Sequence, residues 1–159
     1  MRLTAEPRGK YFLPSKKLHL IALVGFEHDR VLELIRNYEP ALVSLGYATS
    51  DQPDSDEHLA VNKHRFQIVK SICEDGKEFT FPCYDPVGTK KAVEQQVKLR
   101  PDVNIVVAGL NTKASTLGVA LAAMENEKIQ VCYAQALLYN HRNYSRPGDS
   151  FFHYTFEPI

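Results

Sequence analysis

The sequence lacks the features of several common protein classes. No apolar run approaches the roughly 20 residues of a transmembrane helix, and residues 1–7 lack the apolar core of a signal peptide. Lysine and arginine number 19, as do aspartate and glutamate, so the formal net charge is zero and no overall field attracts nucleic acid or anionic lipid. We therefore expect a cytoplasmic protein that binds neither a membrane nor duplex nucleic acid.

Cysteine is scarce, and the usual nucleotide-binding motifs are missing. Cys73, Cys83 and Cys132 are odd in number and far apart, which fits neither a disulfide framework nor paired zinc ligands. The chain has no three-glycine dinucleotide fingerprint and no phosphate loop that ends in Gly-Lys-Ser or Gly-Lys-Thr. These absences argue against ordinary NAD dehydrogenases and P-loop NTPases, and we predict no bound cofactor or metal.

The composition is that of one globular domain. Apolar residues make up 44% of the 159 residues and charged residues 24%, which are ordinary proportions for a folded chain. Residues 1–17 contain prolines, a glycine and five basic side chains but no apolar periodicity. We interpret 1–17 as an N-terminal arm and 18–159 as a single domain.

Beyond the arm, apolar runs with the character of buried strands alternate with segments of helical periodicity. The expected strands cover 18–24, 41–47, 79–84, 103–108 and 129–134, and the expected helices cover 31–38, 59–72, 85–100 and 117–124. The last helix is expected to bury the stripe Leu117, Ala120, Leu121 and Met124. Parallel neighbours require helical crossovers, so the pattern predicts an α/β, three-layer, Rossmann-like fold with a mostly parallel five-stranded sheet and helices on both faces. Aromatic and polar residues alternate over 151–156, which is compatible with an antiparallel edge strand.

Ligands of such sheets bind beyond the carboxyl ends of the strands, where helix N-termini offer free amides. Residues 25–30 follow the first expected strand, and residues 109–116 follow the fourth. Both loops begin with glycine, and the second is rich in hydroxyl and amide side chains around a lysine, as a phosphate contact requires. The candidate ligand-binding residues are Gly25, Phe26, Glu27, Arg30, Gly109, Asn111, Thr112, Lys113 and Ser115.

Each loop also has a purely structural interpretation. In the first, Glu27 and Asp29 complement the dipole of the helix that follows, and Arg30 pairs with Glu33 or Glu27 on a solvated face. Thr112 or Ser115 caps the second helix, which is compatible with anion binding at the same place. Asp85 before Pro86 is typical of a helix cap.

Two further sets of residues are candidates for chemistry at this edge. The carboxylates Glu27, Asp29, Asp51 and Asp85 would form a magnesium site if they converged. Residues 139–146 mix tyrosine and arginine side chains, which suit stacking on bases and contact with phosphate, or equally a protein interface.

Two segments of the sequence are Leu23-Val24-Gly25-Phe26 and residues 103–108 followed by Gly109-Leu110-Asn111-Thr112-Lys113. They resemble the two ligand-facing motifs of CRISPR-associated Rossmann-fold (CARF) sensor domains. The resemblance implies a homodimer that holds a cyclic oligonucleotide across its axis. By position it assigns Gly25, Phe26 and Glu27 to one ligand loop and Gly109, Asn111, Thr112 and Lys113 to the other. Three segments, Gly-Phe-Glu-His-Asp-Arg at 25–30, Tyr-Asp-Pro at 84–86 and Tyr-Asn-His-Arg-Asn-Tyr-Ser at 139–145, are also similar to the carboxyl-terminal half of longer, uncharacterised bacterial Rossmann-like proteins.

Three functions follow as hypotheses. The first is a non-catalytic module that senses a nucleotide or another phosphorylated small molecule and acts with a second copy or a partner protein, in bacterial antiviral defence. The second is a metal-dependent phosphodiesterase or hydrolase that uses Glu27, Asp29 and Asp85. The third is a structural interaction subunit whose contact is formed by Phe151, Phe152, Tyr154 and Phe156.

Overall fold

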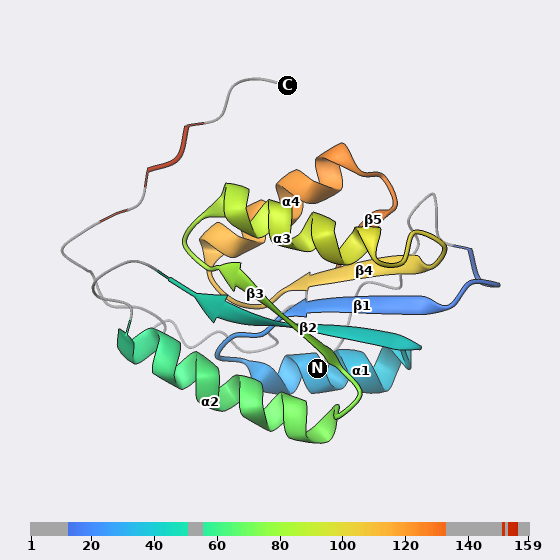
Figure 1. Ribbon diagram of the computed structural model, residues 1–159, viewed down its shortest axis with the longest axis horizontal. Helices are drawn as coiled ribbons and strands as arrows, with labels where there is room; N and C mark the ends of the chain where they lie inside the picture. Colours follow the sequence, from blue (N-terminus) through green and yellow to red (C-terminus); the bar gives the residue numbers. More distant parts are fainter. Residues whose placement is uncertain (1–12, 51–55, 133–150, 152, 156–159) are drawn as a thin grey trace.

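The computed structural model describes residues 13–50, 56–132, 151 and 153–155 (Figure 1). Five strands and four helices alternate along the described chain, and each lies within a few residues of its predicted position. They are β1 (Leu18–Leu23), α1 (His28–Tyr38), β2 (Leu42–Thr49), α2 (Asp56–Ile72), β3 (Lys77–Pro82), α3 (Pro86–Lys98), β4 (Asn104–Gly109), α4 (Lys113–Glu125) and β5 (Ile129–Cys132).

The sheet is entirely parallel, with strand order β3-β2-β1-β4-β5. Helices α1 and α2 cover one face and α3 and α4 cover the other, which confirms the three-layer Rossmann-like prediction (Figure 1). From β1 the chain first adds strands on one side and then, with β4, on the other. The carboxyl ends of β1 and β4 therefore flank the topological switch point, where sheets of this kind bind their ligands.

Strand β1 is the centre of the core because it is covered on both faces. Ile21 and Ala22 are both fully buried, and they belong to different apolar clusters. Ala22 packs with α1 and α2 through residues such as Val31 and Phe66, whereas Ile21 packs with the layer of α3 and α4. This double coverage explains why 18–24 is an almost continuous apolar run.

The apolar stripe predicted for α4 is wrong. Its core-facing residues are small ones, and Met124 is 66% exposed. The side chains that α4 buries are Ser115, Gly118, Val119 and Ala122. Small residues are required here because α4 packs closely on α3: a Cβ at Gly118 would lie 2.5 Å from the carbonyl oxygen of Pro86 and 2.7 Å from the Cβ of Thr89.

Gly118→Ala is expected to destabilise the protein by about 2 kcal/mol, although the same change in an exposed helix stabilises by up to about 1 kcal/mol. The loss arises because the new methyl group meets the backbone of Pro86 at the start of α3. Chemical denaturation of both proteins measures the effect, with Met124→Ala as an exposed control on the same helix. An unchanged or raised unfolding free energy would show that the two helices are not in tight contact.

The ends of the chain depart from the prediction or lie outside the described residues. Residues 151 and 153–155 form no strand, and Tyr154 instead donates a hydrogen bond of 2.6 Å to the carbonyl oxygen of Tyr84. Residues 152 and 156 of the expected edge strand, and the whole of 139–146, lie outside the described residues.

The described part of the expected N-terminal arm is attached to the sheet through the buried residue Asn104, whose backbone amide donates to the Lys17 carbonyl at 2.9 Å. Asn104, at the start of β4, accepts from the Leu13 amide at 2.9 Å and donates to the carbonyl oxygens of Leu13 and Lys16 at 2.7 and 3.1 Å. Residues 1–12 lie outside the described chain. No described helix combines the length and apolar character needed to cross a bilayer.

Candidate functional site

The two glycine-led loops meet at the switch point between β1 and β4. Leu23 pairs with Gly109 in the sheet register, and the Leu110 amide donates to the Leu23 carbonyl at 3.2 Å. The Asn111 side-chain amide donates to the Val24 carbonyl at 2.6 Å. A Cβ at Gly25 would lie only 2.1 Å from the Leu110 carbonyl oxygen, so glycine is what permits this approach. The structure thus brings Gly25, Gly109 and Asn111 together, as the sequence predicted.

The polar side chains of the second loop form hydrogen bonds within the protein that stabilise the loop. Asn111 Oδ1 accepts from the Thr112 amide at 2.9 Å, and Thr112 Oγ1 accepts from the Ser115 amide at 3.0 Å as the N-cap of α4. The Thr112 hydroxyl also donates to the Cys83 carbonyl, and the Ser115 hydroxyl donates to the Thr112 carbonyl at 2.8 Å. These bonds fix the N-terminus of α4 relative to β1 and to the end of β3.

Lys113 differs from its neighbours because its side chain is exposed at the first residue of α4. The amides of Lys113 and Ala114, in the first helical turn, have no acceptor within the helix. An exposed ammonium group beside such amides is suited to a phosphate or carboxylate. Lys113 is therefore the candidate residue best placed to contact an anion.

The first loop presents an aromatic ring and an ion pair. Phe26 is 50% exposed, directly after the buried Gly25. Glu27 occupies the N-cap position of α1 without a side-chain capping bond, and its carboxylate lies 2.6 Å from the guanidinium of Arg30. The expected pairing of Arg30 with Glu27 is confirmed.

Sequence reasoning missed an aromatic cluster formed by Phe26, His58 and Tyr84. The ring centroids of Phe26 and His58 are 4.9 Å apart, and those of His58 and Tyr84 are 5.8 Å apart. The Tyr84 hydroxyl lies 3.4 Å from His58 Nδ1, and burial lowers the pKa of His58, which keeps its imidazole neutral at pH 7. The cluster joins the loop after β1, helix α2 and the loop after β3. The only signal for it in the sequence was the position of Tyr84 at the end of an expected strand.

The carboxylates do not converge within the described part of the chain. Asp85 caps α3 by accepting from the Val87 amide at 2.9 Å, Glu27 pairs with Arg30, and the Asp29 side chain is 84% exposed. In residues 13–50, 56–132, 151 and 153–155, no group of three or more histidine, cysteine, aspartate or glutamate side chains is arranged to hold a metal. Asp51 lies outside these ranges.

Cys83, the cysteine that contacts the site, is not an activated nucleophile. All three cysteines are free thiols. Burial raises the pKa of Cys83, the one nearest the site, to about 11, so it is protonated at neutral pH. Its carbonyl, rather than its thiol, contacts the site through Thr112.

No protein-family model matches the chain, and no curated protein matches it in sequence. The resemblance to CARF sensor domains therefore stays a prediction.

Proposed function

We propose that this protein is a non-catalytic, nucleotide-binding regulatory module whose site lies at the switch point between β1 and β4. The observation that carries the proposal is the direct contact between the loops after these strands, which brings the N-termini of α1 and α4 to one place. Helix N-termini at such a point attract phosphate through their amides and their partial positive charge.

The two loops supply complementary contacts to a nucleotide. Lys113 and the first-turn amides of α4 bind the phosphate, whereas the exposed ring of Phe26 offers a stacking surface for the base. Phe26 packs against His58, which in turn packs against Tyr84, and the contact with His58 limits the freedom of the Phe26 ring. A preordered aromatic surface loses less entropy when a base stacks on it.

A binding role is favoured over hydrolysis because the acidic and nucleophilic groups near the site already have structural roles or are buried. Asp85 caps a helix, Glu27 pairs with Arg30, and Cys83 is buried and protonated. The hydrolase hypothesis has no comparable support among the described residues. For the interaction-subunit hypothesis, Phe151 is 88% exposed, but Tyr154 contacts the loop of Tyr84 within the same chain.

The CARF resemblance extends the proposal to the ligand and its effect. It suggests a cyclic oligonucleotide bound by a homodimer, with occupancy passed to a partner protein in antiviral defence. The shared chemistry is a ring of phosphates, which needs a cation and free amides from each copy. Lys113 of each chain meets that requirement.

Lys113→Ala is expected to weaken nucleotide binding by at least about tenfold, because charged hydrogen bonds to phosphate are among the stronger single contacts. The melting temperature is expected to stay nearly unchanged, since the side chain is exposed. Calorimetric titration with AMP, ATP and a cyclic oligonucleotide measures both the affinity and the preferred ligand.

The matched control is Lys128→Ala, which removes another exposed lysine just beyond the opposite end of α4. It should bind like the unmodified protein. Absence of binding by every nucleotide, or equal affinities for both variants, would refute the proposal.

A further inference from the structure

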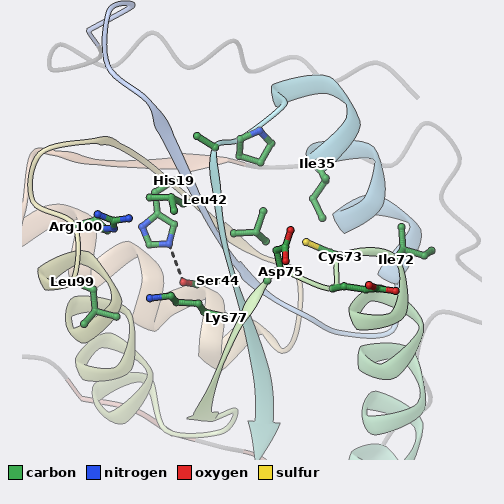
Figure 2. Close-up of a pocket in the computed structure, with 15 residues that line it drawn as sticks. His19, Ile35, Leu42, Ser44, Ile72, Cys73, Asp75, Lys77, Leu99 and Arg100 are labelled. Carbon is green, nitrogen blue, oxygen red and sulfur yellow. Dashed lines mark hydrogen bonds between the residues drawn. The ribbon is translucent and has the colours of Figure 1, made fainter.

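A cavity lies at the amino-terminal edge of the sheet, opposite the edge that carries the proposed nucleotide site. It has a volume of about 410 Å³, within the range of small-molecule sites, and is lined by the starts of β1, β2 and β3 and by residues at the ends of α1, α2 and α3 (Figure 2). The cavity is separate from the proposed nucleotide site, because that site lies at the carboxyl ends of the parallel strands, at the other edge of the sheet.

Two buried polar side chains line this cavity. His19 is 3% exposed and Ser44 is 1% exposed, and His19 Nε2 lies 2.9 Å from Ser44 Oγ. His19 Nδ1 is buried without a hydrogen-bond partner. When the Ser44 hydroxyl donates to Nε2, the ring proton is on Nδ1, which becomes a donor that lacks an acceptor.

Two cations accompany this donor. Lys77 and Arg100 line the cavity, and Figure 2 shows the imidazole of His19 between Ser44 on one side and the Arg100 guanidinium on the other. Within the described part of the chain, neither cation forms an ion pair with an acidic side chain.

The charge around His19 is positive. Burial, followed by the charges of Arg100 and Lys77, lowers the pKa of His19 from 6.5 to about 4, so the imidazole is neutral at pH 7. Glu74 and Asp75 also line the cavity, and Figure 2 draws Asp75 on the other side of β2 from His19.

We propose that this cavity binds a small organic anion. The carboxylate or phosphate head of this anion lies between Arg100, Lys77 and the Nδ1 proton of His19. Its apolar body lies against Leu42 and Leu99, which line the cavity on the same side of β2 as His19. The head gives the two cations a counter-ion and gives the orphaned donor an acceptor. A cavity of this size holds more than an inorganic ion, which is why an organic body is expected.

The test is a titration of the full chain with hexanoate, hexyl phosphate and the neutral control hexanol, followed through the imidazole NMR signals of His19. At least one anion should bind saturably with a Kd of about 1 mM or tighter, and hexanol should bind more weakly. Whichever anion binds more tightly identifies the head group. A bound anion should also raise the pKa of His19, because a negative charge favours the imidazolium.

Arg100→Gln is expected to weaken anion binding by about tenfold or more, whereas Lys91→Gln, which removes an exposed lysine on α3, should leave it unchanged. Both variants change exposed side chains, so melting temperatures near that of the parent would verify folding. Equal binding of hexanol and hexanoate, no saturable shift of His19 with either anion, or unchanged binding by Arg100→Gln would overturn the proposal.

Discussion

Gly25→Ala is expected to lower the free energy of unfolding by about 3 kcal/mol and to abolish nucleotide binding. The added methyl group would lie 2.1 Å from the Leu110 carbonyl oxygen and 2.8 Å from the Cα of Asn111. Both are backbone atoms, so no side-chain rotation relieves the clash. The loops must separate, and the Asn111 bond to the Val24 carbonyl is strained or lost. Denaturant unfolding and calorimetric titration measure the two effects.

Gly109→Ala is the matched control, because it adds the same atom to the other glycine-led loop. Its nearest neighbours would be Thr116 Oγ1 at 3.3 Å and Thr116 Cα at 3.4 Å, which small shifts can accommodate. Its cost should stay below about 1 kcal/mol. Equal stability losses for the two alanine variants would contradict the close contact between the loops.

Acidification from pH 7 to pH 4 is expected to cost the protein about 3 kcal/mol of stability through His19 alone. Burial, followed by the charges of Arg100 and Lys77, lowers the pKa of His19 from 6.5 to about 4. The unfolded chain therefore binds a proton at a higher pH than the folded chain. The contribution of His19 is complete above pH 6.5 and is lost as the pH falls towards 4.

His19→Gln isolates this effect, because its side chain stays neutral across the range while every other titrating group is retained. Unfolding free energies of the two proteins, measured by urea titration between pH 7 and pH 4, should converge as the pH falls, by about 3 kcal/mol. Parallel curves would show that His19 is protonated as readily in the folded state as in the unfolded chain.

The fold was predictable because its signals are local. The run 18–24 is apolar at nearly every position because β1 is covered on both faces, and the Asp85-Pro86 pair marks the start of α3 by its capping chemistry. The prediction of the buried face of α4 failed because the local signal in its sequence is weak. The burial of α4 is set by the close approach of α3 at Gly118, and periodicity does not report the distance between helices.

The candidate site was only partly predictable. Glycines and polar residues after β1 and β4 located the meeting point, since parallel strands end at one edge. The sequence did not reveal that the Thr112 hydroxyl donates a hydrogen bond to the Cys83 carbonyl, or that the rings of His58 and Phe26 are in contact. Both contacts are between residues of separate elements. His19 was hidden for a similar reason: its partner Ser44 is 25 residues away, on a neighbouring strand.

The most direct test of the proposed nucleotide site is a map of backbone amide NMR shifts during titration with the nucleotide that binds most tightly. The account predicts saturable shifts concentrated at residues 25–30 and 110–116, with little change at His19, Ser44 and Lys77 at the opposite edge. Shifts confined to that opposite edge, or no saturable shift at either loop, would contradict it.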